Sequence, residues 1–145
     1  RWTLHRPSGR LTETVIDDRG DEFPRINGRY GGQAYRYVYS AHWGNDVAFG
    51  PAMKHDMQRQ TTEVHDYGPG RMTAEPVFVR KAGATAEDQG WILSYVYDPH
   101  RDLSDVVILD AQDFAGEPVA TIRLPVRVPF GFHGGWAPDR ITVVE

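Results

Sequence analysis

The sequence predicts an all-β fold that forms part of a β-propeller. Fifteen glycines and ten prolines interrupt the 145 residues at short intervals, which breaks helices and favours turns. Between these breaks lie short runs rich in Val, Ile, Tyr, Phe and Thr, and helical periodicity is nearly absent. Hairpins recur at the ~40–45-residue spacing of a four-stranded propeller blade, so the chain has room for about three blades. We therefore expect a single domain over residues 1–145.

The N-terminal half is expected to contain five strands. Trp2-Thr3-Leu4-His5 starts the first strand, Pro7–Arg10 is a polar turn, and the run from Leu11 returns alongside it. Runs rich in Tyr, Val and Thr predict three further strands before the tight turn at Gly68-Pro69-Gly70. The expected ranges are 2–6, 11–17, 34–40, 51–57 and 61–66.

The C-terminal half is expected to contain four strands, which include the most apolar part of the chain. Ile92–Tyr97 and Val106–Leu109 should be central and well buried, with Pro99–Asp102 as the turn between them. Residues 83–90 are a polar connection with at most one helical turn, at Ala84–Asp88. Consecutive strands joined by short polar turns predict an antiparallel meander. The expected ranges are 76–80, 91–97, 104–110 and 117–124.

Composition excludes several classes of function. The net charge of −4 and the pI near 5.8 leave no basic stripe for phosphates, so nucleic acid is not expected as a partner. The absence of cysteine excludes disulfides and Cys-ligated zinc or iron–sulfur sites. It also suits a reducing compartment, so we expect a cytoplasmic protein. The sequence has no run of 18 apolar residues and no secretory signal.

The start of the sequence suggests that blades are missing. Three blades alone would leave unpaired edges and an open channel wall, which soluble proteins avoid. The chain begins at Arg1 without a methionine and enters a strand at once. We therefore expect a processed or truncated N-terminus.

The run Pro129–Trp136 places a histidine between glycines and aromatic residues. The glycines let the backbone turn where a side chain would not fit. Phe130, Phe132 and Trp136 would supply apolar walls that exclude water from the imidazole of His133. A lone histidine is more often a structural residue than a metal ligand, so this run alone does not predict a metal site.

The other candidate residues carry weaker signals. His55 and His65 lie in facing strand candidates and could approach each other across a hairpin, although surface or hydrogen-bonded positions are the commoner outcome. His42 is placed in a solvated loop at Ala41–Asn45, where contact with a substrate is the alternative. The sequence contains no Gly-x-Ser-x-Gly elbow and no cysteine nucleophile.

Two glutamates stand out because each precedes an apolar run that reads as a buried strand. Glu22 precedes Phe23-Pro24-Arg25-Ile26, and Glu75 precedes Pro76–Val79. An unpaired carboxylate would be costly there, so each needs a partner. A strand-end cap or an arginine is the structural option, and the N–H of an imidazole is the functional one.

Four stretches together resemble, in order and spacing, the C-terminal part of the carotenoid cleavage oxygenase family. That family includes the bacterial lignostilbene and apocarotenoid dioxygenases. The resemblance extends from Leu11 to Trp136, nearly the whole chain. The stretches are Asp21–Asn27, Ala74–Val79, Glu87–Trp91 and Pro129–Trp136.

The resemblance implies a seven-bladed propeller with Fe(II) on its axis, held by four histidines whose outer N–H groups donate to nearby glutamates. By motif, His133 matches the last of these ligands, and Glu22 and Glu75 match two of the glutamates. Such carboxylates fix the imidazole tautomers and offset the metal charge. The other five histidines do not match the family's ligand motifs, so the remaining three ligands would lie upstream of Arg1.

The implied activity is cleavage of a conjugated C=C bond by O2 to give two carbonyl products. The substrate would be an apolar polyene or stilbene-like molecule in a tunnel beside the iron. Phe130, Phe132 and Trp136 would line that tunnel or, equally well, pack the propeller floor. Such greasy substrates also suggest peripheral contact with a membrane.

One imidazole does not hold iron tightly, so we expect the isolated 145-residue chain to be inactive without the remainder of the propeller. The alternative function is a non-catalytic β-domain that binds a protein partner by strand addition at an exposed sheet edge. Three further histidines at strand ends in the upstream sequence would favour the enzyme.

Overall fold

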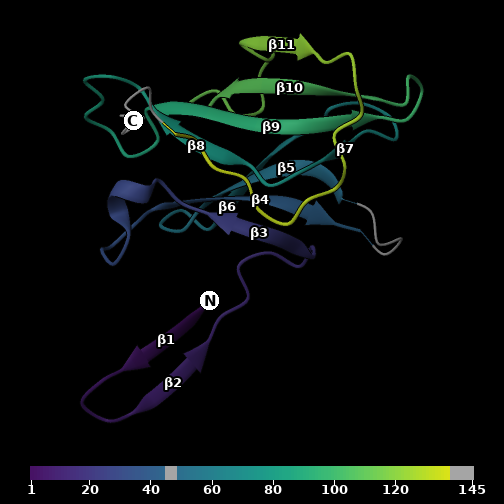
Figure 1. The fold of residues 1–145 in the computed structure, drawn as a ribbon. Coiled ribbons are helices and arrows are strands. Elements are labelled where there is room, and N and C mark those ends of the chain that lie inside the picture. The colour runs from purple at the N-terminus through teal and green to yellow at the C-terminus, as the bar shows by residue number, and fades with distance from the viewer. Residues whose placement is uncertain (45–48, 138–145) are drawn as a thin grey trace, which may run out of the picture.

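In the computed structural model, two antiparallel sheets pack face to face and a separate hairpin precedes them (Figure 1). The structure describes residues 1–44 and 49–137. Within these ranges the one helical element is the 3-10 helix η1 (Gly28–Tyr30), and none of the described helices could cross a membrane. The predicted all-β class is confirmed.

The hairpin consists of β1 (Trp2–His5) and β2 (Arg10–Glu13). Thr3 pairs with Thr12 and Leu4 with Leu11, and the turn closes at Gly9, which has a φ of 66°. The second strand is shorter than expected. Figure 1 shows the hairpin standing apart from the two sheets, and Trp2, Leu4 and Leu11 are exposed. Apolar side chains on one face of an isolated hairpin indicate a surface that needs a partner.

The first sheet has its four strands side by side in chain order. They are β3 (Asp21–Arg25), β4 (Tyr37–Trp43), β5 (Phe49–Asp56) and β6 (Thr61–His65). Residues 21–25 are absent from the predicted strand ranges, although the run from Phe23 to Ile26 reads as a buried strand. The sheet tolerates Pro24 because β3 is an edge strand, where one side of the backbone needs no ladder partner.

The second sheet is also antiparallel and is built around β9. Both β7 and β8 pair with β9, which in turn pairs with β10, and β11 forms the far edge. The two-residue strand β7 was not expected, and residues 83–90 contain no helix. The strands are β7 (Met72–Thr73), β8 (Val77–Arg80), β9 (Gly90–Asp98), β10 (Leu103–Asp110) and β11 (Ala120–Arg123).

The main buried apolar cluster lies between the two sheets. Ile92 and Val96 of β9 are fully buried, whereas Tyr95 between them is 49% exposed. The strands β9 and β10 are central, as expected, and the face that packs against the first sheet is well buried. Tyr95 lies on the opposite face, because successive side chains of a strand point to opposite sides of the sheet. The buried cluster comprises Tyr39, Ala52, Ile92, Val96, Val107, Leu109, Ala111 and Phe114.

Gly90 of β9 lies against β8 with no room for a side chain. A Cβ atom at this position would lie 2.4 Å from the Phe78 ring and 2.5 Å from the Val79 carbonyl oxygen. The Val79 atom belongs to the backbone and cannot rotate away, so only glycine permits this pairing. Because β8 follows Glu75 directly along the chain, the close contact also fixes the position of that residue.

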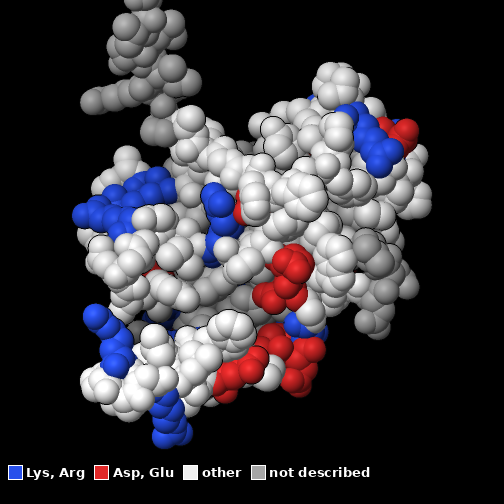
Figure 2. Space-filling view, turned by 60° about the horizontal axis from the view of Figure 1, so that its bottom comes forward, with Lys and Arg blue, Asp and Glu red and all other residues white. Residues whose placement is uncertain are grey.

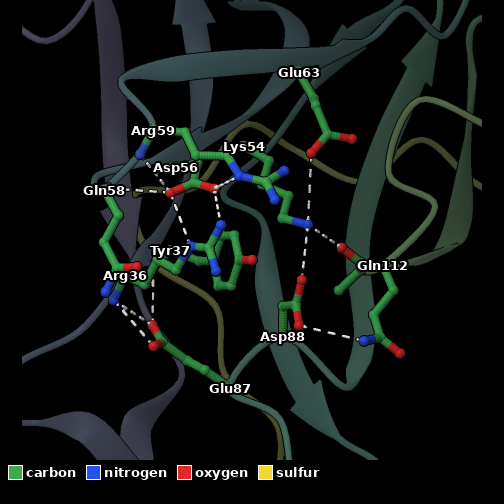
Figure 3. A network of polar contacts seen from close by, with 11 residues as sticks. Arg36, Tyr37, Lys54, Asp56, Gln58, Arg59, Glu63, Glu87, Asp88 and Gln112 are labelled. Carbon is green, nitrogen blue, oxygen red and sulfur yellow. Dashed lines mark hydrogen bonds and ion pairs between the residues drawn. The ribbon is translucent and has the colours of Figure 1, made fainter.

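A layer of charged side chains joins the two sheets beside the apolar core (Figure 3). The Lys54 ammonium of β5 is 3% exposed and donates to Asp88 Oδ2 at 3.1 Å and to the Ala111 carbonyl at 2.6 Å. It also lies 4.5 Å from the centre of the Tyr37 ring. Asp88 and Ala111 belong to the connections that flank β9 and β10, so a buried lysine of the first sheet is bound by the second.

Asp56, at the end of β5, organises the other part of this layer. Its carboxylate accepts hydrogen bonds from Arg36 Nε at 2.9 Å and from the backbone N–H groups of Gln58 and Arg59 at 3.0 Å each. The hydrogen bonds of Asp56 therefore connect β5 to the segment before β4.

The described residues form no single charged patch on the face of the molecule shown in Figure 2. The Lys, Arg, Asp and Glu side chains there lie in small clusters among uncharged side chains.

We expect the stability of the chain to fall when the pH drops below about 4. The hydrogen bond from Arg36 holds the pKa of Asp56 well below its ordinary value of ~3.9. Its stabilising contribution is therefore present above that ordinary value and is lost as the pH falls toward the folded-state pKa. Urea unfolding midpoints at pH 7 and pH 3 should differ less for Asp56→Asn than for the unsubstituted chain. Equal differences would contradict this.

Candidate functional site

The structure brings together two of the predicted site residues, His133 and Glu75, which are 58 positions apart in the sequence. His133 Nδ1 lies 3.2 Å from Glu75 Oε1, and the backbone N–H of Gly134 donates to Glu75 Oε2 at 2.7 Å. The Glu75 side chain is 4% exposed, whereas that of His133 is 73% exposed. A buried carboxylate therefore holds an imidazole that is open to its surroundings.

Glu75 has a third partner, Arg25 of β3. Arg25 Nη1 lies 3.4 Å from Glu75 Oε1, and Arg25 Nη2 lies 3.4 Å from the Gly134 carbonyl oxygen. The two partners considered for this carboxylate, an arginine and an imidazole N–H, are thus both present. Their combined hydrogen bonds offset the cost of burying the Glu75 charge.

Phe23 contacts the imidazole from β3. Its ring centre lies 5.9 Å from that of His133 at an interplanar angle of 77°, and 4.9 Å from that of Phe49. Phe23 has a φ of 57°, which is rare for a bulky residue, and it lies where the β3–β4 register shifts between Glu22 and Arg25. The irregularity is a β-bulge, a feature that redirects side chains near functional sites.

Glu22 does not join this group. It lies within the edge strand β3 rather than before a buried strand, and its exposed side chain makes no hydrogen bond or ion pair with residues 1–44 or 49–137. The expectation that a buried environment forces Glu22 to find a partner is therefore wrong for this part of the chain. The Glu22 carboxylate lies in solvent.

His133 and Glu75 lie in the wall of an apolar groove of about 810 Å³. The floor is the open face of the second sheet, which carries Leu93, Tyr95 and Ile108. Phe130, Phe132 and Trp136 also line the groove, but they are 53%, 81% and 57% exposed. They do not exclude water from the imidazole, contrary to expectation, because nothing among the described residues covers them.

The other histidines occupy structural positions. His42 lies in β4, not in the expected loop, with its Nδ1 2.8 Å from the Gly20 carbonyl oxygen. His55 is buried, with Ser40 and Asp21 each 3.0 Å from its Nε2. His65 does not approach it, because His55 pairs with Thr62 and His65 with Ala52, which places the two rings on opposite faces of the sheet.

The donor set fits one ligand position of a metal site and no more. Across residues 1–44 and 49–137, no group of three or more His, Asp or Glu side chains could hold an ion. At His133, the contact with Glu75 occupies Nδ1 and leaves Nε2 as the ring nitrogen available to a metal. A metal-ligating histidine usually donates its other N–H to a carboxylate in this way. The further ligands would have to come from residues outside this set.

Sequence reasoning did not identify Arg25 and Phe23 as parts of the site. Both belong to the Asp21–Asn27 stretch that carried the family resemblance, but there only Glu22 was assigned a role. The signal that could have found them is Pro24 between them: a proline within a strand-forming run favours an edge strand or a bulge. The bulge turns Phe23 and Arg25 toward the C-terminal segment.

The chain is similar to known proteins over nearly its whole length. The family model described as retinal pigment epithelial membrane protein matches residues 1–138. A carotenoid cleavage oxygenase of Mycobacterium tuberculosis is 37% identical, over 95% of this chain and 28% of that protein. Apocarotenoid-15,15'-oxygenase of Synechocystis sp. is 32% identical, over 94% of this chain and 29% of that protein.

The crystal structure of cobalt-substituted Synechocystis ACO superposes with a TM-score of 0.89 at 31% identity, covering 94% of this chain and 29% of that one. The chain therefore spans less than a third of the length of these relatives. The match over residues 1–138 and the two identities above 30% show that the chain belongs to the carotenoid cleavage oxygenase family and corresponds to its C-terminal portion.

Proposed function

We propose that this chain is the C-terminal part of a non-heme Fe(II) dioxygenase that cleaves a conjugated C=C bond of a carotenoid, apocarotenoid or stilbene with O2. Both atoms of O2 would end in the two carbonyl products, so the reaction balances without a further reductant. The observation that carries the proposal is the hydrogen bond between His133 and the buried Glu75. The names of the similar oxygenases support a carotenoid or apocarotenoid substrate, and the family resemblance adds the stilbene.

Within such an enzyme, His133 would provide one of four imidazole ligands through Nε2. Glu75 would keep the proton on Nδ1 and contribute a negative charge near the cation. Glu22 would play the same role for a ligand on a preceding blade, because it lies beside Phe23 on the edge strand nearest the His133 ring. Bound Fe(II) would supply the activation of O2.

The apolar groove would serve two purposes. A further blade of a seven-bladed propeller would cover Leu93, Tyr95 and Ile108 on the open sheet face, since a contiguous apolar face marks an interface. The tunnel for an apolar polyene would be lined by the aromatic residues that are within three positions of His133 in the sequence, namely Phe130, Phe132 and Trp136. Covering these aromatic rings would also remove water from the imidazole.

We expect the 145 residues alone to retain no stoichiometric iron and to cleave no substrate, because they supply one ligand. The longer polypeptide, with the preceding blades, should do both. Each protein is incubated anaerobically with Fe(II), desalted and assayed for iron by mass spectrometry. Cleavage of an apocarotenoid and of a stilbene is followed by loss of the conjugated absorption band. Tight stoichiometric iron with turnover by the 145 residues would show that a different ligand set exists.

A further inference from the structure

The bulge in β3 sends two side chains toward the same short segment. Phe23 places its ring edge on the His133 imidazole, and Arg25 reaches both Glu75 and the Gly134 carbonyl. The backbone between them is irregular, because the β3–β4 register shifts between Glu22 and Arg25 and Phe23 has a φ of 57°. Backbone strain of this kind persists where the surrounding structure over-determines it, often at functional sites.

We propose that Arg25 is a positioning residue that fixes the orientation of the His133 ring through two separate contacts. This inference rests on the proposed function, because it assigns the ring a ligand role. One guanidinium nitrogen lies 3.4 Å from Glu75 Oε1, the same oxygen that lies 3.2 Å from His133 Nδ1. The other lies 3.4 Å from the carbonyl oxygen of Gly134, the residue that follows His133.

The two contacts of Arg25 restrain two different motions that would change the orientation of the imidazole. The contact between Arg25 and Glu75 Oε1 limits rotation of the carboxylate, so the acceptor of the Nδ1 proton stays in place. Holding the Gly134 carbonyl limits the backbone at a Gly-Gly step, which would otherwise have wide conformational freedom. Arg25 thus restrains both the acceptor of the ring and the backbone that carries it.

The geometry requires an arginine. The guanidinium presents several N–H donors in a rigid fork and can bind two acceptors at once, whereas a lysine ammonium is a compact point charge. Arg25 is permanently cationic and is not itself a metal ligand. Its side chain is 39% exposed and that of Glu75 is 4% exposed, so the arginine approaches the buried carboxylate from the solvent side.

The test uses the longer polypeptide that binds iron, with the substitutions Arg25→Gln and Arg25→Lys. We expect Arg25→Gln to weaken iron affinity about 10–100-fold in chelator competition, the range typical for residues that orient metal ligands. Arg25→Lys should recover only part of this affinity. Arg29→Gln is the matched control, because Arg29 is exposed in the nearby η1 helix, and it should bind iron normally.

Two further measurements separate positioning from general stability. The visible absorption spectrum of the Co(II)-substituted protein, which responds to ligand geometry, should change in Arg25→Gln and move back toward the original in Arg25→Lys. The thermal unfolding midpoint of the metal-free protein should stay close to that of Arg29→Gln. Wild-type affinity in Arg25→Gln, or weaker affinity with an unchanged cobalt spectrum, would overturn the inference. These results would leave the proposed function in place as long as His133→Ala loses its iron. Iron retained by His133→Ala would contradict the proposed function as well.

Discussion

Replacement of His133 by alanine is expected to abolish iron binding by the longer polypeptide. The substitution removes an imidazole whose Nδ1 is held by Glu75 and whose Nε2 is free for a metal, and three remaining ligands would leave the ion exposed to competing chelators. Iron content after desalting and the cleavage rate of an apocarotenoid would measure the effect. Both should fall to the level of protein that was never exposed to iron.

A graded comparison strengthens this test. Glu75→Gln keeps the shape of the side chain but removes its charge, so iron affinity or activity should fall by about 10–100-fold rather than vanish. His100→Ala is the control, because His100 is an exposed histidine in the turn between β9 and β10. If His133→Ala retained as much iron as His100→Ala, the imidazole would not be a ligand. If Glu75→Gln left iron affinity and activity unchanged, Glu75 would have a structural role only.

The second large effect concerns the charged layer between the sheets. Asp88→Ala should destabilise the folded chain by about 3–5 kcal/mol, because it leaves the Lys54 ammonium buried without its closest carboxylate. Glu63 lies 3.6 Å from the same ammonium, but its side chain is 47% exposed, so it compensates only weakly. Urea unfolding at pH 7 would measure the loss as a change in the free energy of unfolding.

Two variants serve as references for this measurement. Asp18→Asn removes an exposed carboxylate from the chain and should change the free energy by no more than about 0.5 kcal/mol. The double substitution Lys54→Met with Asp88→Leu removes both charges at once and should cost far less than Asp88→Ala alone. An Asp88→Ala value near that of Asp18→Asn would mean that Lys54 reaches solvent, contrary to its 3% exposure.

Much of the strand order could be read from the sequence, because glycine and proline mark the turns. The pairs β5–β6 and β9–β10 lie close to their predicted ranges for this reason. The edge position of β3 could not be predicted, since the run after Glu22 reads as a buried strand and an edge is a property of the whole sheet. The strand β7 has two residues, which is too short for any periodicity.

The cost of a buried carboxylate predicted that Glu75 needs a partner, and the family resemblance predicted roles for Glu75 and His133, but which glutamate binds which histidine is known only from the structure. The exposure of Glu22 could not be foreseen, because the apolar run after it reads as a buried strand. Arg25 lies in a bulge, and its two contacts depend on the backbone at Phe23, whose φ no local pattern specifies. Long-range partners of this kind arise from packing rather than from spacing.

The close approach at Gly90 affects how a map of tolerated substitutions would be interpreted. Saturation mutagenesis would reject every other amino acid at this codon, because a Cβ would collide with the Val79 backbone and displace β8 together with the glutamate that precedes it. Position 90 would then show the same low tolerance to substitution as a metal ligand, although glycine contributes no side-chain group to the site. A position that accepts no substitution is therefore not necessarily a ligand. It can instead be a glycine whose lack of a side chain allows neighbouring residues to reach the positions in which they bind.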